Sequence, residues 1–205
     1  MFDGNAASFA LRYPFGRGGT AVVLTMVLSL LSFLVVPATF VVGYLVRLAG
    51  AAARAEQPPE YEDLGGLLVL GVAASVGLVG YAGAVAALVY AGLQVDVTLA
   101  GAFTVAGCYF APASVTALAA TGAVGPAAAV DGVLSFALTR HYLFRFVAYV
   151  LVVVIAGVVG LVALFFVPFG LLLAPLAAVP SAAYWGHAYG TALDEGVVDP
   201  LPADG

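Results

Sequence analysis

The sequence has no lysine and only six arginines, set against eleven acidic residues, so that its net charge is −5 and its pI is near 4.6. Nucleic-acid binding needs a basic face that displaces phosphate counterions, and this composition argues against that class of partner. The single cysteine, Cys108, excludes an internal disulfide and a CxxC metal or redox motif. We therefore predict no cofactor and no metal centre.

Charged residues are scarce as well and make up only 8% of the sequence. Hydrophobic residues make up 64%, and the mean hydropathy is +1.14. A soluble domain is excluded by these values. Apolar runs cover 18–46, 64–93, 97–120 and 146–190, and each is at least as long as the roughly 20 residues that cross about 30 Å of hydrocarbon. Their residues are apolar on every face, which favours helices over a β-barrel. The sequence predicts an all-α integral membrane protein.

The number of segments depends on how two of these runs are divided. The run 146–190 is about 68 Å long as a helix, so it must contain two spans that turn near Pro168. The run 18–46 is about 44 Å long and is either one kinked span or a hairpin that turns near Pro37. The hairpin places all six arginines and both termini on the cytoplasmic side. The arginines are Arg12, Arg17, Arg47, Arg54, Arg140 and Arg145. We predict about six segments, with a five-span arrangement as the alternative.

These segments group into three units, each an interfacial or elbow helix followed by a hairpin, within one transmembrane domain that covers 1–205. Pro58-Pro59 with its following acids predicts an elbow helix before the middle hairpin, and Gly125-Pro126 predicts a surface helix before the last one. The predicted parts are an N-terminal interfacial segment over 1–17, a first hairpin over 18–55, an elbow and middle hairpin over 56–120, an interfacial helix and last hairpin over 121–190, and a flexible acidic tail over 191–205.

Small residues at regular spacing mark the surfaces where helices are expected to pack closely. They are Gly71, Ser75, Gly80 and Ala84 in the third segment and Gly157 and Gly160 in the fifth. The alternative is that some of them line a ligand or a dimer contact.

A polar path is a second hypothesis, because Thr25, Ser29 and Ser32 fall on one face of the first segment. Hydroxyls at such positions also bond to their own helix backbone, which is the structural alternative. Arg47 lies ten residues past Pro37, so a hairpin would start its side chain near bilayer depth. There it would contact an anionic lipid or substrate, or else snorkel to the cytoplasmic interface.

Ionisable groups at depth are few. Between residues 64 and 190 the only carboxylates are Asp96 and Asp131, and both lie in expected connections. Ion-coupled carriers and membrane proteases need such groups within their spans. An enzyme would have to use Asp131, His141 and His187, although His187 fits an interfacial aromatic belt with Trp185 better. We therefore expect no catalytic residues and a non-enzymatic structural, accessory or interaction protein, which binds the bilayer and associates with itself or a partner. The alternative is a small permease or channel for a weakly charged or apolar solute.

Four blocks of the sequence resemble a known family. They are Leu11-Arg12-Tyr13-Pro14-Phe15, Gly43-Tyr44-Leu45-Val46-Arg47, Pro58-Pro59-Glu60-Tyr61-Glu62-Asp63-Leu64, and Val167-Pro168-Phe169 with Gly186-His187-Ala188-Tyr189. Together they are similar to the domain of unknown function 4013 (DUF4013), a family of small archaeal and bacterial multi-pass membrane proteins. The resemblance implies a cytoplasmic-membrane protein, commonly haloarchaeal, with no established activity and no site residues to transfer. The chain departs from the family at Gly65-Gly66, where an aromatic and a basic residue are frequent. The acidic composition without lysine agrees with a high-salt cytoplasm.

Overall fold

The computed structural model describes residues 6–31, 35–121, 126–163 and 167–198. Within these ranges the chain forms eight α-helices and one 3-10 turn, and no strand, which confirms the predicted all-α class. The elements are α1 (Ala6–Arg12), η1 (Tyr13–Phe15), α2 (Thr20–Leu30), α3 (Val35–Ala53), α4 (Leu64–Leu93), α5 (Val97–Thr121), α6 (Pro126–Ala137), α7 (Arg140–Ala163) and α8 (Val167–Asp194).

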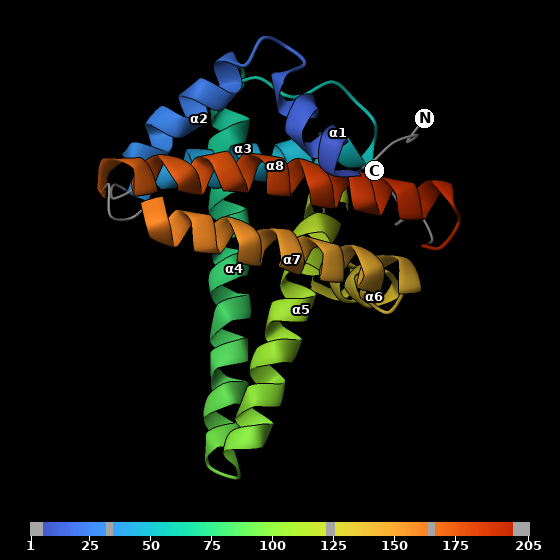
Figure 1. The fold of residues 1–205 in the computed structure, drawn as a ribbon. Helices are drawn as coiled ribbons and strands as arrows, with labels where there is room; N and C mark the ends of the chain where they lie inside the picture. Colours follow the sequence, from blue (N-terminus) through green and yellow to red (C-terminus); the bar gives the residue numbers. More distant parts are fainter. Residues whose placement is uncertain (1–5, 32–34, 122–125, 164–166, 199–205) are drawn as a thin grey trace.

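The helices form two groups that run across each other (Figure 1). Helices α4 and α5 pair as a long hairpin, and α3, α7 and α8, which we call the crosswise layer, pass over one end of it. Helices α1 and α2 lie beyond this layer, on the side away from the free end of the hairpin. The tip of the hairpin therefore lies far from the other described elements.

Local sequence explains several helix boundaries. Gly18 and Gly19 precede α2 with φ of 92° and 77°, a left-handed conformation that side chains other than glycine rarely adopt. Asp63 caps α4, because its Oδ1 accepts a hydrogen bond from the Gly66 N–H at 2.9 Å. Helix α6 begins at Pro126, where the missing N–H costs nothing. A helix is thus present where the sequence predicts one before the last hairpin.

The first apolar run contains two helices. Helix α2 ends at Leu30 and α3 begins at Val35, with Pro37 in its first turn, so two helices occupy the run. Helix α2 has only 11 residues, about 17 Å, which is roughly half of the hydrocarbon thickness. Among the described residues, three helices are long and apolar enough to cross a membrane, namely α3, α4 and α5. Helices of spanning length and composition are thus found for three of the six predicted segments.

Two predicted boundaries differ from the structure. The elbow helix expected after Pro58 is not formed, and the chain stays non-helical until α4 begins at Leu64. Each proline disfavours the helical conformation of the residue before it, and Glu60 and Asp63 pair with arginines outside the segment. At the other end, α8 continues to Asp194, and Val198 after it is buried. Residues 199–205 of the predicted tail lie outside the described residues.

Glycines let α3 pack directly against its neighbours on two sides. A Cβ atom on Gly43 would lie 2.2 Å from the carbonyl oxygen of Leu67 in α4, and one on Gly50 would lie 2.4 Å from that of Ala119 in α5. These glycines are seven residues apart, so they share one face of α3 and contact both arms of the hairpin base. On the α8 side, a Cβ atom on Gly186 would lie 2.1 Å from the Ala49 oxygen. Helix α3 is therefore fixed between the hairpin and α8.

An aromatic core joins α5, α6, α7 and α8. Phe136, Tyr142 and Tyr189 are fully buried, and both tyrosine rings pack edge to face on Phe136, each with its ring centroid 5.0 Å from that of Phe136. Trp185 packs against Tyr142 at 5.2 Å. The aromatic belt expected near His187 is therefore an interior cluster. Phe136 anchors α6 to α7 and α8 through these contacts.

Beyond its base the hairpin is apolar and uncovered. The buried residues of α4 are Leu67, Gly71 and Ala74 near its start and Gly92 near its end, whereas Val79 exposes 73% of its surface. A Cβ atom added to Gly77, Gly80 or Gly83 would meet nothing within 4 Å. The two arms contact each other through Gly92, which packs on Ala100. A surface of this kind is covered by lipid or by a partner and not by water.

Candidate functional site

The described charges concentrate on the segment between α3 and α4, residues 54–63, which we call the acidic loop. It passes over the side of the crosswise layer where α1 and α2 lie (Figure 1). Arg54 holds Glu56 through two contacts, Nε to Oε1 at 2.8 Å and Nη2 to Oε2 at 3.0 Å. Arg17 donates to Gln57 Oε1 at 3.0 Å and lies 3.9 Å from Glu60. The loop is thus tied at its start to its own arginine and at its middle to the segment before α2.

The end of the acidic loop is tied to α3. Arg47 Nη2 lies 3.2 Å from Asp63 Oδ2, while Asp63 Oδ1 caps α4. The hydrogen bond from the Gly66 N–H, followed by the Arg47 guanidinium, holds the pKa of the Asp63 carboxyl below its usual range. A Cβ atom on Gly66 would lie 2.1 Å from Asp63 Oδ2, so glycine is required for this approach. One carboxylate therefore couples the start of α4 to the middle of α3.

Two tyrosines hold the acidic loop against the neighbouring elements, Tyr13 from η1 and Tyr61 from the loop itself. Tyr13 donates from its hydroxyl to the Glu56 carbonyl at 2.9 Å. Tyr61 stacks on Tyr44 with ring centroids 4.7 Å apart, and its hydroxyl lies 2.8 Å from Thr25 Oγ1. The Thr25 hydroxyl donates its only proton to the Ala21 carbonyl at 2.7 Å, so Tyr61 is the donor in its hydrogen bond with Thr25. Burial raises the pKa of Tyr61 to about 12, and this hydroxyl therefore stays protonated at neutral pH.

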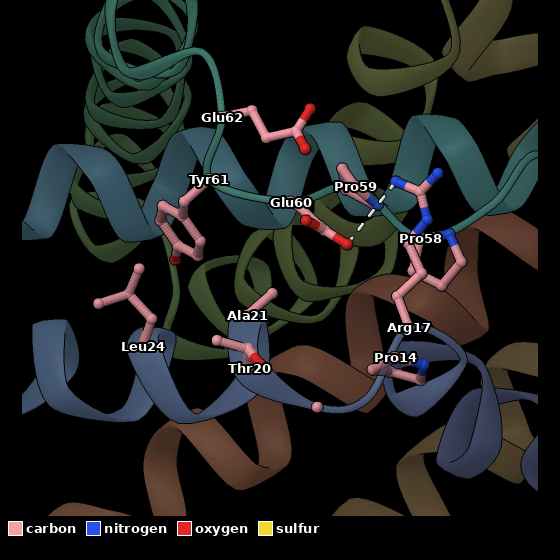
Figure 2. A pocket seen from close by; sticks show the side chains of 11 residues that line it. Pro14, Arg17, Thr20, Ala21, Leu24, Pro58, Pro59, Glu60, Tyr61 and Glu62 are labelled. Atoms are coloured by element: carbon pink, nitrogen blue, oxygen red, sulfur yellow. Dashed lines mark ion pairs between the residues drawn. The ribbon is translucent and has the colours of Figure 1, made fainter.

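A pocket of about 230 Å³ lies between the first turns of α2 and the acidic loop (Figure 2). Its residues are Pro14, Arg17, Gly19, Thr20, Ala21, Leu24, Pro58, Pro59, Glu60, Tyr61 and Glu62. The Arg17 side chain reaches across it toward Glu60, the Tyr61 ring points down toward α2, and Glu62 points away. The pocket is thus mostly apolar, and its guanidinium is already engaged by the loop.

The predicted polar residues have local partners. Ser29 donates to the Thr25 carbonyl at 2.7 Å, so both hydroxyls bond to carbonyls of their own helix. Ser32 lies outside the described residues. Arg47 meets the capping carboxylate of Asp63 and keeps 29% of its side chain exposed. Neither outcome tests the predicted solute path or the predicted contact with an anionic lipid.

The predicted packing residues fall into three groups. A Cβ atom on Gly71 would lie 1.9 Å from the Thr39 oxygen, so α3 and α4 touch there. Ser75 is half-buried, whereas Gly80 and Ala84 lie on the exposed arm of α4. The surroundings of Gly157 and Gly160 are not among those described. Sequence reasoning missed Gly43 and Gly50, although their seven-residue spacing is a signal that could have identified them.

Of the three candidates for an enzyme site, His141 and His187 lie near enough for their charges to interact. His141 Nδ1 lies 3.3 Å from Glu195 Oε2 near the start of α7. His187 is buried in α8 and stacks on Phe9 of α1 with ring centroids 4.3 Å apart. The side chain of Asp131 is not among those described. Among the described residues, three or more His, Cys, Asp or Glu side chains do not gather as metal ligands.

Comparison with known protein families gives a match. The family model described as "Protein of unknown function (DUF4013)" matches residues 27–107, which confirms the predicted resemblance over this segment. The matched segment covers α3, the acidic loop, α4 and the first part of α5. No curated protein and no solved structure matches the chain.

Proposed function

We propose that this chain is a multi-pass integral protein of the cytoplasmic membrane that acts without catalysis, as a structural or interaction component, with both termini on the cytoplasmic side. The observation that carries the proposal is the free arm of the α4–α5 hairpin. From Gly71, where α3 crosses, to Leu93 it rises about 33 Å. This length matches the hydrocarbon thickness of about 30 Å.

Charge placement supports the orientation. Between Leu64 and Thr121 the only charged residue is Asp96, which lies at the tip. Arg17, Arg47 and Arg54 all engage the acidic loop at the opposite end. Arginines near the ends of spans favour the cytoplasmic side. The base of the hairpin is therefore assigned to the cytoplasm and the tip to the outside.

The use of the polar side chains supports a non-catalytic role. The arginines and acids of the loop pair with one another, and the hydroxyls of Thr25 and Ser29 bond to carbonyls of α2. The permease alternative depends on these hydroxyls and gains no support from them. The surplus of acids and the missing lysine support a salt-rich prokaryotic cell, in line with the resemblance to a commonly haloarchaeal family.

Cysteine labelling in a Cys108→Ala background tests the orientation. We expect an impermeant maleimide to label Asp96→Cys in intact cells and to label Glu62→Cys only after permeabilisation. Glu62 is the matched reporter at the base, because it is exposed and points away from the loop pocket. Labelling of Glu62→Cys from outside would reverse the orientation, and extraction of the protein by alkaline carbonate would remove it from the integral class.

A further inference from the structure

We infer that the α4–α5 hairpin alone crosses the bilayer, and that the crosswise layer lies within the cytoplasmic leaflet with α7 against its acyl chains. This inference rests on the proposed function and deepens it by assigning a lipid contact to each part. The α2–α3 and α7–α8 pairs then enter the membrane and return on the side they came from. With two crossings in place of six, the number of crossings is still even, so every arginine remains on the cytoplasmic side.

The arrangement of the helices is the first argument. Helices α3, α7 and α8 run across α4 and α5 (Figure 1). Two sets of helices that cross in this way cannot both follow the bilayer normal. Close contacts hold the sets together, since Gly43 and Gly50 of α3 lie directly on the backbones of α4 and α5. One set crosses the membrane, and the other lies along its plane.

The connections indicate which set crosses. The turn between α4 and α5 contains Gln94 and Asp96, which suit an aqueous surface. The sequence from 164 to 169, between α7 and the first turn of α8, reads Leu-Phe-Phe-Val-Pro-Phe and has no polar side chain. An outer-surface turn of that composition would expose three phenylalanines to water. Helix α2 adds a second limit, because 11 residues cover only about 17 Å.

The surface of α7 identifies lipid as its partner. All six residues from Val150 to Ile155 are exposed. At 100° per residue they point in every direction around the helix axis. A protein partner would cover one face of such a helix, whereas acyl chains cover all of them. Helix α7 also lies on the hairpin side of α8, which is the side that faces the hydrocarbon in this orientation (Figure 1).

The charged loop completes the assignment. Glu56 and Asp63 keep more than half of their side chains exposed, and Glu60 keeps 43%. If the crosswise layer spanned the membrane, the acidic loop would face the lipid from the side. With the hairpin as the crossing element, the same loop faces the cytoplasm. The cost of exposing ionised carboxylates to hydrocarbon is thereby avoided.

Depth measurement by spin labelling tests the inference with two matched pairs of valines. Val147 and Val154 of α7 are both exposed, and so are Val72 and Val79 of α4. Each pair spans seven residues on one helix face, a rise of about 10 Å. Each valine is replaced by cysteine in the Cys108→Ala background, labelled and reconstituted in vesicles. Accessibility to oxygen and to a water-soluble nickel chelate then gives the depth of each label.

We expect Val72→Cys and Val79→Cys to differ in depth by about 10 Å, and Val147→Cys and Val154→Cys to lie at nearly the same depth, all within the hydrocarbon. A difference of about 10 Å in both pairs would overturn the two-crossing arrangement and leave the proposed function standing. A difference confined to the α7 pair would overturn it as well. Labels of both pairs in water would overturn the proposed function itself.

Discussion

The contact between α3 and α4 should not tolerate a single added methyl group. A Cβ atom at Gly71 would lie 1.9 Å from the Thr39 oxygen, and ordinary contact begins near 3.4 Å, so the helices would have to separate by about 1.5 Å. A gap of 0.5–1 Å already forfeits a quarter to a half of a van der Waals contact. Overpacking of this kind costs about 1–3 kcal/mol. We expect Gly71→Ala to lower the unfolding free energy by about that amount.

Gly80→Ala is the matched control, because it lies on the same helix and its new Cβ atom would meet nothing within 4 Å. Its change should be neutral or stabilising by up to about 1 kcal/mol, since alanine favours the helix. The measurement is the thermal unfolding of both variants in the same detergent, with size-exclusion chromatography as the readout. If Gly71→Ala unfolded at the same temperature as Gly80→Ala, the close approach of α3 and α4 would be refuted.

Three further changes probe the loop and the base of the hairpin. Tyr61→Phe keeps the stack on Tyr44 but leaves Thr25 Oγ1 without its donor. The unfolding free energy, measured by a thermal melt, should fall by about 1 kcal/mol. An unchanged melt would contradict the hydrogen bond. The pKa of Asp63 is lowered by folding, so its stabilisation is present above the unfolded pKa of about 3.9 and is lost as the pH falls through the folded value. Wild type should therefore melt above Asp63→Asn at pH 6, the two should converge in acid, and a pH-independent difference would refute the assignment. Leu67→Ala, at a fully buried position, should lower the unfolding free energy by about 2–5 kcal/mol. The control Leu68→Ala, at the exposed neighbouring position, should lower it far less. Equal losses would place the α3–α4 contact elsewhere.

Much of the architecture could be predicted because it follows from the lengths of the apolar runs and from the prolines at their boundaries. The apolar runs and the position of Pro126 set the helical class and the start of α6. The direction of the helices could not be predicted in this way. Hydropathy measures how apolar a segment is, and it contains no information on whether the segment lies along the bilayer normal or in its plane. Close tertiary contacts, such as those of Gly43 and Gly50 in α3 with α4 and α5, determine that crossing.

The acidic loop shows a second limit of sequence reasoning. The cluster of acids after Pro58 and Pro59 has the composition of a helix start, and only Asp63 serves as a cap. Glu60 pairs with Arg17, and Asp63 also pairs with Arg47, through contacts that the folded backbone brings together. Arg47 could be identified from its position ten residues after Pro37, but its partner Asp63 could not. Long-range partners of this kind need the tertiary structure.

The lone carboxylate at the hairpin tip has a consequence for biogenesis. In the proposed orientation, with α4 and α5 inserted together as a paired unit, Asp96 is the one charged group of that unit that would pass through the hydrocarbon. Insertion scales set the penalty for aspartate at about 2.5–3.5 kcal/mol at the centre of a helix, against a gain of about 0.3–0.6 kcal/mol for each leucine, isoleucine, phenylalanine or valine. The arms contain enough such residues to exceed that penalty, so the unit can enter the membrane without the rest of the chain.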